Sequence, residues 1–194
     1  MKHKAGTLCL MLGVLLLAAA LALFGYNEWQ AQKAGRAAEA ALQQVAAAQA
    51  AAATAETAAR DPMPVQQVEG VAYIGTLSFP TLDLELPVLA NWAFDSLQTA
   101  PCRYSGSLEE ENLVVAGHNY TRHFGRLDLL RPGDAVQFTT MDGVEHDYTV
   151  AVVETLPPEA VAEMTAGEYP LSLFTCDYSG QARITVRCQR SSLG

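Results

Sequence analysis

Lysine is absent from the C-terminal two thirds of this chain, and its absence limits what that segment can bind. Residues 71–194 contain seven arginines and sixteen acidic residues, whereas residues 1–70 carry five basic and five acidic side chains. The whole net charge of −9 therefore belongs to residues 71–194. Because an acidic surface repels phosphate backbones, we expect no nucleic acid among the partners.

Cysteine and histidine are scarce, with four of each in 194 residues. No two cysteines form a CxxC pair, and no histidine stands at a metal-like spacing from them. We therefore predict neither a zinc site nor any other cofactor. In an oxidising milieu Cys102 and Cys188 could form a disulfide or remain two buried thiols, and the sequence leaves both alternatives open.

The long uncharged run lies at the N-terminus, where twenty residues from Thr7 to Tyr26 follow Lys2, His3 and Lys4. Twenty helical residues rise about 30 Å, enough to cross a bilayer core. We predict a cytoplasmic tail at residues 1–6, a transmembrane anchor at 7–26 and an extracellular remainder, because basic flanks stay inside. A signal peptide cleaved near Ala20-Leu21-Ala22 is the alternative, but the apolar run continues past that point.

The segment after the anchor is dominated by alanine, which supplies sixteen of the twenty-nine residues from Ala31 to Ala59. Alanine has the highest helix propensity, so residues 27–60 are predicted to form a helical stalk. Large apolar residues at coiled-coil spacing are missing. The prolines of Asp61-Pro62-Met63-Pro64 end the helix, which makes residues 61–70 a linker and residues 71–194 the globular domain.

The globular segment is predicted to be mainly β, because short runs rich in β-branched and aromatic residues follow one another without an internal repeat. Met141-Asp142-Gly143 is typical of a hairpin turn of the primed type. Seven or eight short strands in about 120 residues favour a closed or nearly closed β-barrel. The predicted strands are 71–79, 84–89, 112–116, 135–140, 144–155, 171–175 and 183–188, and the short helices are 94–98, 123–130 and 158–164.

Three reactive side chains stand at or near the ends of these strands. Cys176 ends the run LSLFTC, His118 follows the run NLVVAG, and Arg183 opens the last strand. A thiolate is a nucleophile, an imidazole can take and return its proton, and a guanidinium can hold a developing oxyanion. Arg187 shares a strand face with Arg183 and competes for the same role. Together these residues indicate thiolate-based acyl transfer.

The local pattern around these residues resembles the sortase family of membrane-anchored cysteine transpeptidases. The family's nucleophile ends a strand reading T-L-x-T-C, for which this chain has S-L-F-T-C at residues 172–176. Gly117-His118 is similar to the family's histidine context, and Arg183 is the best match to its arginine. The resemblance spans about residues 70–190, and the anchor and stalk agree with it.

The resemblance implies a sortase-like eight-stranded β-barrel with short helices, and a two-step reaction outside the cell membrane. Cys176 would cleave an LPxTG-like sorting signal of a surface protein or pilin, and His118 would act as acid and base. Arg183 would hold the substrate or the oxyanion, Thr175 would shape the site beside the thiol, and Arg187 is a second substrate-binding candidate. The acceptor would be an amine from a peptidoglycan precursor or a pilin lysine.

Features that distinguish sortase subtypes remain open in the sequence. The chain has no C-terminal apolar segment like the second membrane span of pilin-polymerising members. Asp61-Pro62-Met63 stands where those members have a lid, but with methionine in place of the aromatic residue. Some members bind calcium, yet for Glu109-Glu110-Glu111 we favour a solvated acidic loop and predict no metal.

Two other classes of protein compete with this interpretation. The first is a different extracytoplasmic cysteine peptidase, although papain-like enzymes place the cysteine before the histidine, and L,D-transpeptidases have glycine where this chain has Thr175. The second is a non-catalytic, membrane-anchored β-barrel binding module with Cys176 in its core. His123 and His146 are the fallback bases if His118 does not serve.

Overall fold

The computed structural model describes residues 2–53 and 63–191. The chain divides into two compact units, Met1–Lys33 and Ala34–Gly194. The second unit thus includes part of the segment predicted to be a stalk, residues 27–60, and the predicted domain bounds stay a prediction. The proposed lid residues Asp61 and Pro62 lie outside the described residues, whereas Met63 is buried in the core of the second unit.

The N-terminal helix α1 spans Lys2–Ala53 without interruption. Its part Cys9–Ala52 is long and apolar enough to cross a membrane. In the first unit large apolar side chains such as Leu15 and Phe24 are exposed to the surroundings. Exposed apolar side chains over this length make the segment a candidate membrane anchor.

From Ala34 onward α1 packs against the barrel of the second unit. One face of the helix is buried, and its members recur every three or four residues: Ala34, Ala38, Ala41 and Val45. Gln49 adds side-chain hydrogen bonds from Nε2 to the carbonyl oxygens of Thr139 at 3.1 Å and Thr140 at 3.0 Å. The sequence does not predict this contact, because the exposed positions of the helix are also alanine. Helical periodicity is recognised from a difference between apolar and polar faces, and that difference is missing here.

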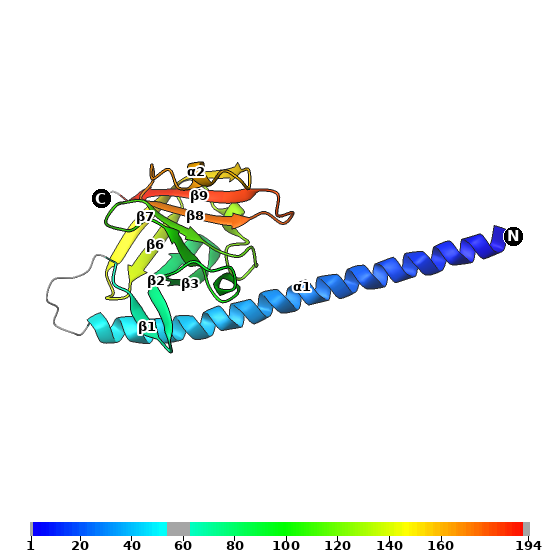
Figure 1. Cartoon of the computed structure of the whole chain (residues 1–194), viewed down its shortest axis with the longest axis horizontal. Coiled ribbons are helices and arrows are strands. Elements are labelled where there is room, and N and C mark those ends of the chain that lie inside the picture. Colours follow the sequence, from blue (N-terminus) through cyan, green and yellow to red (C-terminus); the bar gives the residue numbers. More distant parts are fainter. Residues whose placement is uncertain (1, 54–62, 192–194) are drawn as a thin grey trace. The chain divides into compact units, whose positions relative to one another are not determined.

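The second unit is a closed barrel, as predicted from the resemblance (Figure 1). Eight strands follow one another in the order β2-β3-β4-β5-β8-β9-β7-β6, and β6 pairs with β2 to close the sheet. A ninth strand, β1, pairs with β2 alone. The strands are β1 Gln66–Val68, β2 Val71–Phe79, β3 Leu84–Leu89, β4 Cys102–Ser105, β5 Leu113–Ala116, β6 Ala135–Thr140, β7 Glu145–Leu156, β8 Leu171–Cys176 and β9 Arg183–Arg190.

The sequence prediction found seven of these strands and missed β1 and β4, which are short. The helical connections are brief, as expected: the 3-10 turns η1 Pro80–Leu82, η2 Ser96–Gln98 and η3 Leu127–Leu129, and the helix α2 Val161–Met164. The hairpin between β6 and β7 is confirmed, but its turn differs from the predicted type. Gly143 has a positive φ of 82° and Asp142 does not, so this is a three-residue turn with glycine in the left-handed position.

The closure of the barrel depends on a close backbone approach at Gly75. A Cβ at this position would lie 2.1 Å from the carbonyl oxygen of Thr139 on β6, and the glycine also has a φ of 155°. The β2–β3 pairing shifts register between Tyr73 and Gly75. Glycine is therefore required here by space and by conformation, since β2 must pair with β3 on one side and β6 on the other.

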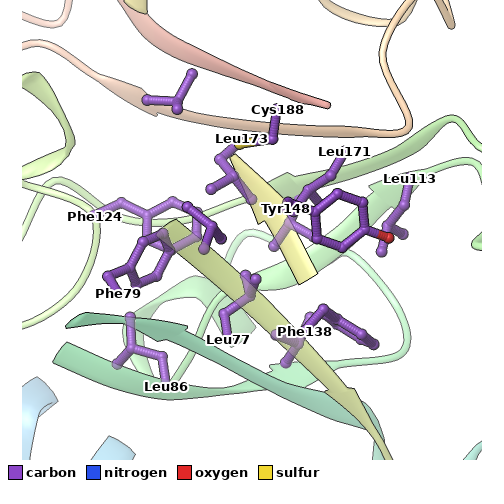
Figure 2. Packing of buried hydrophobic residues seen from close by; sticks show 14 of the residues in the cluster. Leu77, Phe79, Leu86, Leu113, Phe124, Phe138, Tyr148, Leu171, Leu173 and Cys188 are labelled. Carbon is purple, nitrogen blue, oxygen red and sulfur yellow. The ribbon is translucent and has the colours of Figure 1, made fainter. Parts of the chain in front are cut away.

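The barrel interior is filled by aliphatic and aromatic side chains from opposite walls (Figure 2). Leu77 and Phe138 come from the two strands that close the barrel, and each is fully buried. Phe79 meets Phe124 edge to face with ring centroids 6.0 Å apart. Burial of each large apolar side chain contributes about 1.5–3 kcal/mol. Phe124 thus fixes the loop that follows β5 to the core.

Candidate active site

Cys176 is the last residue of β8, a strand paired with β5 on one side and β9 on the other. Leu171 and Leu173 point into the core, whereas the Cys176 side chain is exposed. The apolar run stops at this residue because the chain leaves the barrel wall for the loop at residues 177–182. The fold therefore presents a thiol to solvent at the end of a strand that is otherwise well buried.

His118 lies level with Cys176 on the neighbouring strand. β5 and β8 are parallel, and Ala116 is the Cα partner of Phe174. Beyond β5 the pairing continues with a hydrogen bond of 3.0 Å from the Gly117 amide to the Phe174 carbonyl. Two further residues along each chain in this register place His118 opposite Cys176, and neighbouring strands lie about 4.8 Å apart. 

A side-chain contact fixes this arrangement on the far side of the pair. Asn119 donates from Nδ2 to the carbonyl oxygen of Asp177 at 3.1 Å. The residues before and after His118 are therefore both hydrogen-bonded to the β8 chain, on either side of Cys176. His118 is held in register with the cysteine from both directions.

The imidazole of His118 is half-buried and stacks on the ring of Tyr120, with centroids 3.8 Å apart and planes within 5°. Its Nδ1 is buried, with no hydrogen-bond partner in the described part of the chain. Burial lowers the pKa of His118, and this outweighs the opposite, smaller effect of the Asn119 side chain, which accepts a hydrogen bond from the protonated ring. The ring is consequently mostly neutral near pH 7 and able to accept a proton.

β8 and β9 lie side by side (Figure 1), and Arg183 is the Cα partner of Cys176 across this antiparallel pair. Directly opposed residues on one face have Cβ atoms about 4.5–5.5 Å apart. The guanidinium Nη1 donates to the carbonyls of Gly180 at 3.3 Å and Ala182 at 3.1 Å, so the side chain lies over the loop that joins the strands. The fold brings Cys176, His118 and Arg183 to adjacent ends of three neighbouring strands.

The loop between Cys176 and Arg183 is held by the carboxylate of Asp177. Its Oδ1 accepts a hydrogen bond from the Ala182 amide at 3.0 Å, and its Oδ2 accepts one from the Ser179 hydroxyl. These hydrogen bonds, that from Ser179 first, lower the pKa of Asp177. A carboxylate that bridges both ends of a short loop fixes how the chain returns to Arg183.

Arg187, the second arginine expected to bind substrate, is occupied elsewhere. Its side chain is 6% exposed and its Nε donates to Glu154 Oε1 at 2.9 Å. Its two Nη atoms donate to the carbonyls of Glu163 and Met164 and to the Ser172 hydroxyl. In this structure the guanidinium holds α2 and β7 to the sheet, and its role in substrate binding stays a prediction.

Thr175, expected to shape the site beside the thiol, is turned into the barrel wall. Successive residues of a strand point to opposite faces, and Thr175 is 2% exposed whereas Cys176 is exposed. The Thr175 Oγ1 is buried, with no hydrogen-bond partner among the described residues. Its side chain therefore supports the wall behind the cysteine and does not line the surface that a substrate would meet.

An aromatic row beside Cys176 was not predicted from the sequence. Phe174, two residues before the cysteine on the same strand face, meets Tyr104 edge to face at 5.2 Å, and Tyr104 meets Trp92 at 5.9 Å. Trp92 and Tyr104 also line an open depression of about 660 Å³. The three rings come from separate segments, one of them the unpredicted strand β4, so nothing in the sequence placed them together.

The remaining histidines and cysteines are less suited to this chemistry. His123 is fully buried and its Nε2 lies 3.3 Å from the carbonyl oxygen of Ala34. His146 contacts Arg190 at 2.9 Å, on β7 and away from Cys176. Cys102 and Cys188 are free, buried thiols in separate core clusters, so of the two alternatives for this pair the structure has the unbridged one.

Two of the three acidic residues considered for calcium have protein partners. Glu111 pairs with Arg190 at 3.2 Å, and Glu110 accepts a hydrogen bond from the Asn112 amide. No group of three or more His, Cys, Asp or Glu side chains suited to a metal occurs in the described ranges. 

Comparison with known proteins identifies the fold and the family. The family model for the sortase domain matches residues 77–191, which is more than half of the chain and includes all three reactive residues. The chain belongs to the sortase family. This sortase is therefore a member of a family of cysteine transpeptidases, and the resemblance noted in its sequence is confirmed.

Solved structures agree with the fold of this sortase. Sortase C of Clostridium perfringens, solved with the C-terminal cell wall sorting motif, has 19% identity and a TM-score of 0.56, over 78% of this chain and 88% of the other. Sortase D5 of the same organism gives 17% and 0.55, over 62% and 79%. Sortase C1 of Streptococcus agalactiae gives 21% and 0.53, over 63% and 69%. No curated protein gives a significant match.

Proposed function

We propose that this chain is an active transpeptidase that forms a thioester on Cys176 and transfers the acyl group to an amine. The observation that carries the proposal is the common level of three side chains on adjacent strands. Cys176 lies between His118 on the β5 side and Arg183 on the β9 side. Nucleophile, base and cation at one strand end are the parts that acyl transfer needs.

In the first half of the reaction the sulfur of Cys176 attacks a peptide carbonyl carbon. His118 takes the thiol proton and returns it to the departing amine as the carbon–nitrogen bond breaks, leaving a thioester. In the second half an acceptor amine attacks the thioester and gives its proton to His118. The carbon–sulfur bond then breaks, and the thiolate regains the proton.

Arg183 supports the charge that develops on the attacked carbonyl oxygen. Two of its donors are directed to Gly180 and Ala182, and a guanidinium has five N–H groups, so further donors remain for substrate. A positive charge on the face of the sheet that carries the thiol stabilises a tetrahedral oxyanion more than the neutral carbonyl. We assign Arg183 this role, or that of holding the substrate backbone.

The substrate we propose is an LPxTG-like sorting signal at the C-terminus of a surface protein or pilin. Two observations support this class: a structure similar to this chain was solved with a cell wall sorting motif, and an aromatic row extends from Phe174 beside the cysteine. Rings at this place suit the leucine and proline of such a motif, since both present apolar surface. The acceptor is an amine of a peptidoglycan precursor or a pilin lysine.

We infer that the chain acts at the outer face of the cell membrane. The long N-terminal helix is suited to an anchor, and basic residues precede its apolar run. Positive flanks stay cytoplasmic, which leaves the barrel outside. Sorting signals and peptidoglycan precursors meet at that surface.

The test uses the full chain in detergent, with peptides carrying variants of the LPxTG motif and a small amine acceptor. Intact mass spectrometry is expected to show an acyl adduct on Cys176 and an amine-dependent exchanged peptide. Cys176→Ala removes both and Cys188→Ala removes neither. The proposal fails if the Cys176→Ala chain still forms the exchanged peptide, or if no motif peptide gives an adduct with the wild-type chain.

A further inference from the structure

Tyr120 and His123 lie between the proposed base and the N-terminal helix. The segment at residues 118–126, here named the histidine loop, begins at His118 and turns back on itself. The Phe124 amide donates to the His118 carbonyl at 3.1 Å, and the amides of His123 and Gly125 each donate to the Tyr120 carbonyl at 2.9 Å. The loop is compact, so a displacement of one end reaches the other.

Ring contacts run through this loop from the site to its far side. The His118 imidazole stacks on Tyr120 at 3.8 Å, and Tyr120 meets the His123 ring edge to face at 5.6 Å. His123 is fully buried and reaches the carbonyl oxygen of Ala34 on α1 at 3.3 Å. A carbonyl oxygen only accepts hydrogen bonds, so the Nε2 of this neutral ring is the donor.

Helix α1 contacts the histidine loop at two further points. Glu39 Oε1 accepts from Arg122 Nη1 at 2.8 Å. Gly35 lies directly under Arg122, because a Cβ at this position would approach the Arg122 side chain to 2.1 Å at Cδ and 2.9 Å at Cβ. Glycine inside a helix destabilises it by about 1 kcal/mol relative to alanine. The helix has this less stable residue at the point of closest contact with Arg122.

These contacts separate the roles of the two histidines. Burial lowers the pKa of His123 to about 4, against the smaller, opposite effect of the hydrogen bond to the Ala34 carbonyl. His123 is therefore neutral while the protein works near pH 7, and places no charge against His118. Its function in this arrangement is to join the loop to the helix, leaving proton transfer to His118.

We propose that Tyr120 and His123 are positioning residues for His118, and that α1, by holding the histidine loop at Gly35 and Ala34, sets the geometry of the active site. This inference rests on the proposed function, since it assigns His118 the role of base. It makes activity depend on docking of the helix that continues into the apolar N-terminal segment.

The test compares variants of the full chain in detergent, each with a matched control. Gly35→Ala pushes the helix off the loop, whereas Gly25→Ala makes the same change on the same helix in open space. Tyr120→Leu removes the stacked ring, whereas Tyr120→Phe retains it. His123→Leu breaks the link to Ala34 and replaces one buried ring by an apolar side chain, which serves if Gly35→Ala does not fold.

We expect Gly35→Ala, Tyr120→Leu and His123→Leu to lower kcat by roughly tenfold to a hundredfold, the size associated with displacements near 1 Å. KM should change less than kcat. Tyr120→Phe should lose less activity than Tyr120→Leu, because it keeps the stacked ring, and Gly25→Ala should behave like the wild type. The NMR resonances of the His118 ring should move in the three disruptive variants and stay in the two controls.

The inference is overturned if Gly35→Ala or His123→Leu folds and leaves both kcat and the His118 resonances unchanged. The NMR measurement needs no substrate, so it separates this failure from failure of the proposed function. A wild-type chain without acyl transfer, in which Gly35→Ala still moves the His118 resonances, contradicts the proposed function and retains the positioning role.

Discussion

His118 and Cys176 are separated by 58 residues, the same interval that separates every residue pair of the parallel strands β5 and β8, from Leu113 with Leu171 to Ala116 with Phe174. The interval in the sequence is thus the register of the sheet. Each residue lies two positions beyond the last recorded pair, Ala116 with Phe174, so the register places His118 and Cys176 at one level.

Cys176 should be the thiol of the barrel that reacts with an alkylating reagent. Cys102 and Cys188 are buried, and burial raises the pKa of these thiols to about 11 and about 12. Mass mapping of the iodoacetamide-treated chain at pH 7.5, in a Cys9→Ala background, should find the label on Cys176. Equal labelling of Cys188 in the folded chain would contradict the burial described here.

Replacing His118 with Gln should remove proton transfer while keeping a polar side chain of similar reach. We expect acyl transfer to fall by about 10²–10⁴-fold, the usual contribution of general acid–base catalysis. The rate of adduct formation on Cys176 measures the effect. His146→Gln is the matched control, and a similar loss in that variant would argue against His118 as the base.

Arg183 and Arg187 should respond to substitution in opposite ways. Arg183→Ala is expected to lower kcat/KM by about 10²–10³-fold, as loss of an oxyanion donor does, with little change in urea midpoint. Arg187→Ala should instead destabilise the fold by about 2–3 kcal/mol, because Glu154 and buried backbone carbonyls lose their donor. Unfolding and kinetics on both variants test this, and a reversed pattern would exchange their roles.

Because of His123, the fold should become less stable as the pH falls below the ordinary pKa of histidine. The unfolded chain binds a proton near pH 6.5, whereas burial holds the pKa of folded His123 at about 4. Between these values the unfolded state binds more protons, so stability is complete above pH 6.5 and declines towards pH 4, by roughly 3 kcal/mol. 

A matched variant isolates this contribution. His123→Gln retains a donor towards Ala34 and does not titrate, so the difference in urea midpoint between wild type and variant should shrink from pH 7.5 to pH 4.5. An unchanged difference would mean that His123 does not titrate between those values.

Phe174 should contribute to substrate binding more than to chemistry. Its ring lies two residues before Cys176 on the same face and contacts Tyr104. Phe174→Ala is expected to raise KM for a sorting-signal peptide by roughly 10–100-fold, from the loss of about 1.5–3 kcal/mol of apolar contact. Peptide titration measures it, with Leu129→Ala as an exposed apolar control elsewhere. A changed kcat with constant KM would count against this role.

The sequence by itself determined the family and most of the strands. Alternation and β-branched runs marked seven strands, and the motifs around His118 and Cys176 indicated their family, because these signals are local. A run such as LSLFTC predicts a strand that ends in a thiol, and this prediction does not depend on the rest of the chain.

Only the tertiary structure decided which residues meet. From the sequence, Arg183 and Arg187 compete for the same role beside Cys176. In the structure Arg183 is the strand partner of Cys176, whereas Arg187 is the partner of Ser172 and forms an ion pair with Glu154. The tertiary structure also buries Thr175 and places Trp92, Tyr104 and Phe174 in contact. It packs the alanine face of α1 against the histidine loop. Register, strand neighbours and helix docking are long-range relationships, and burial of the whole core selects them, not the preference of any one segment.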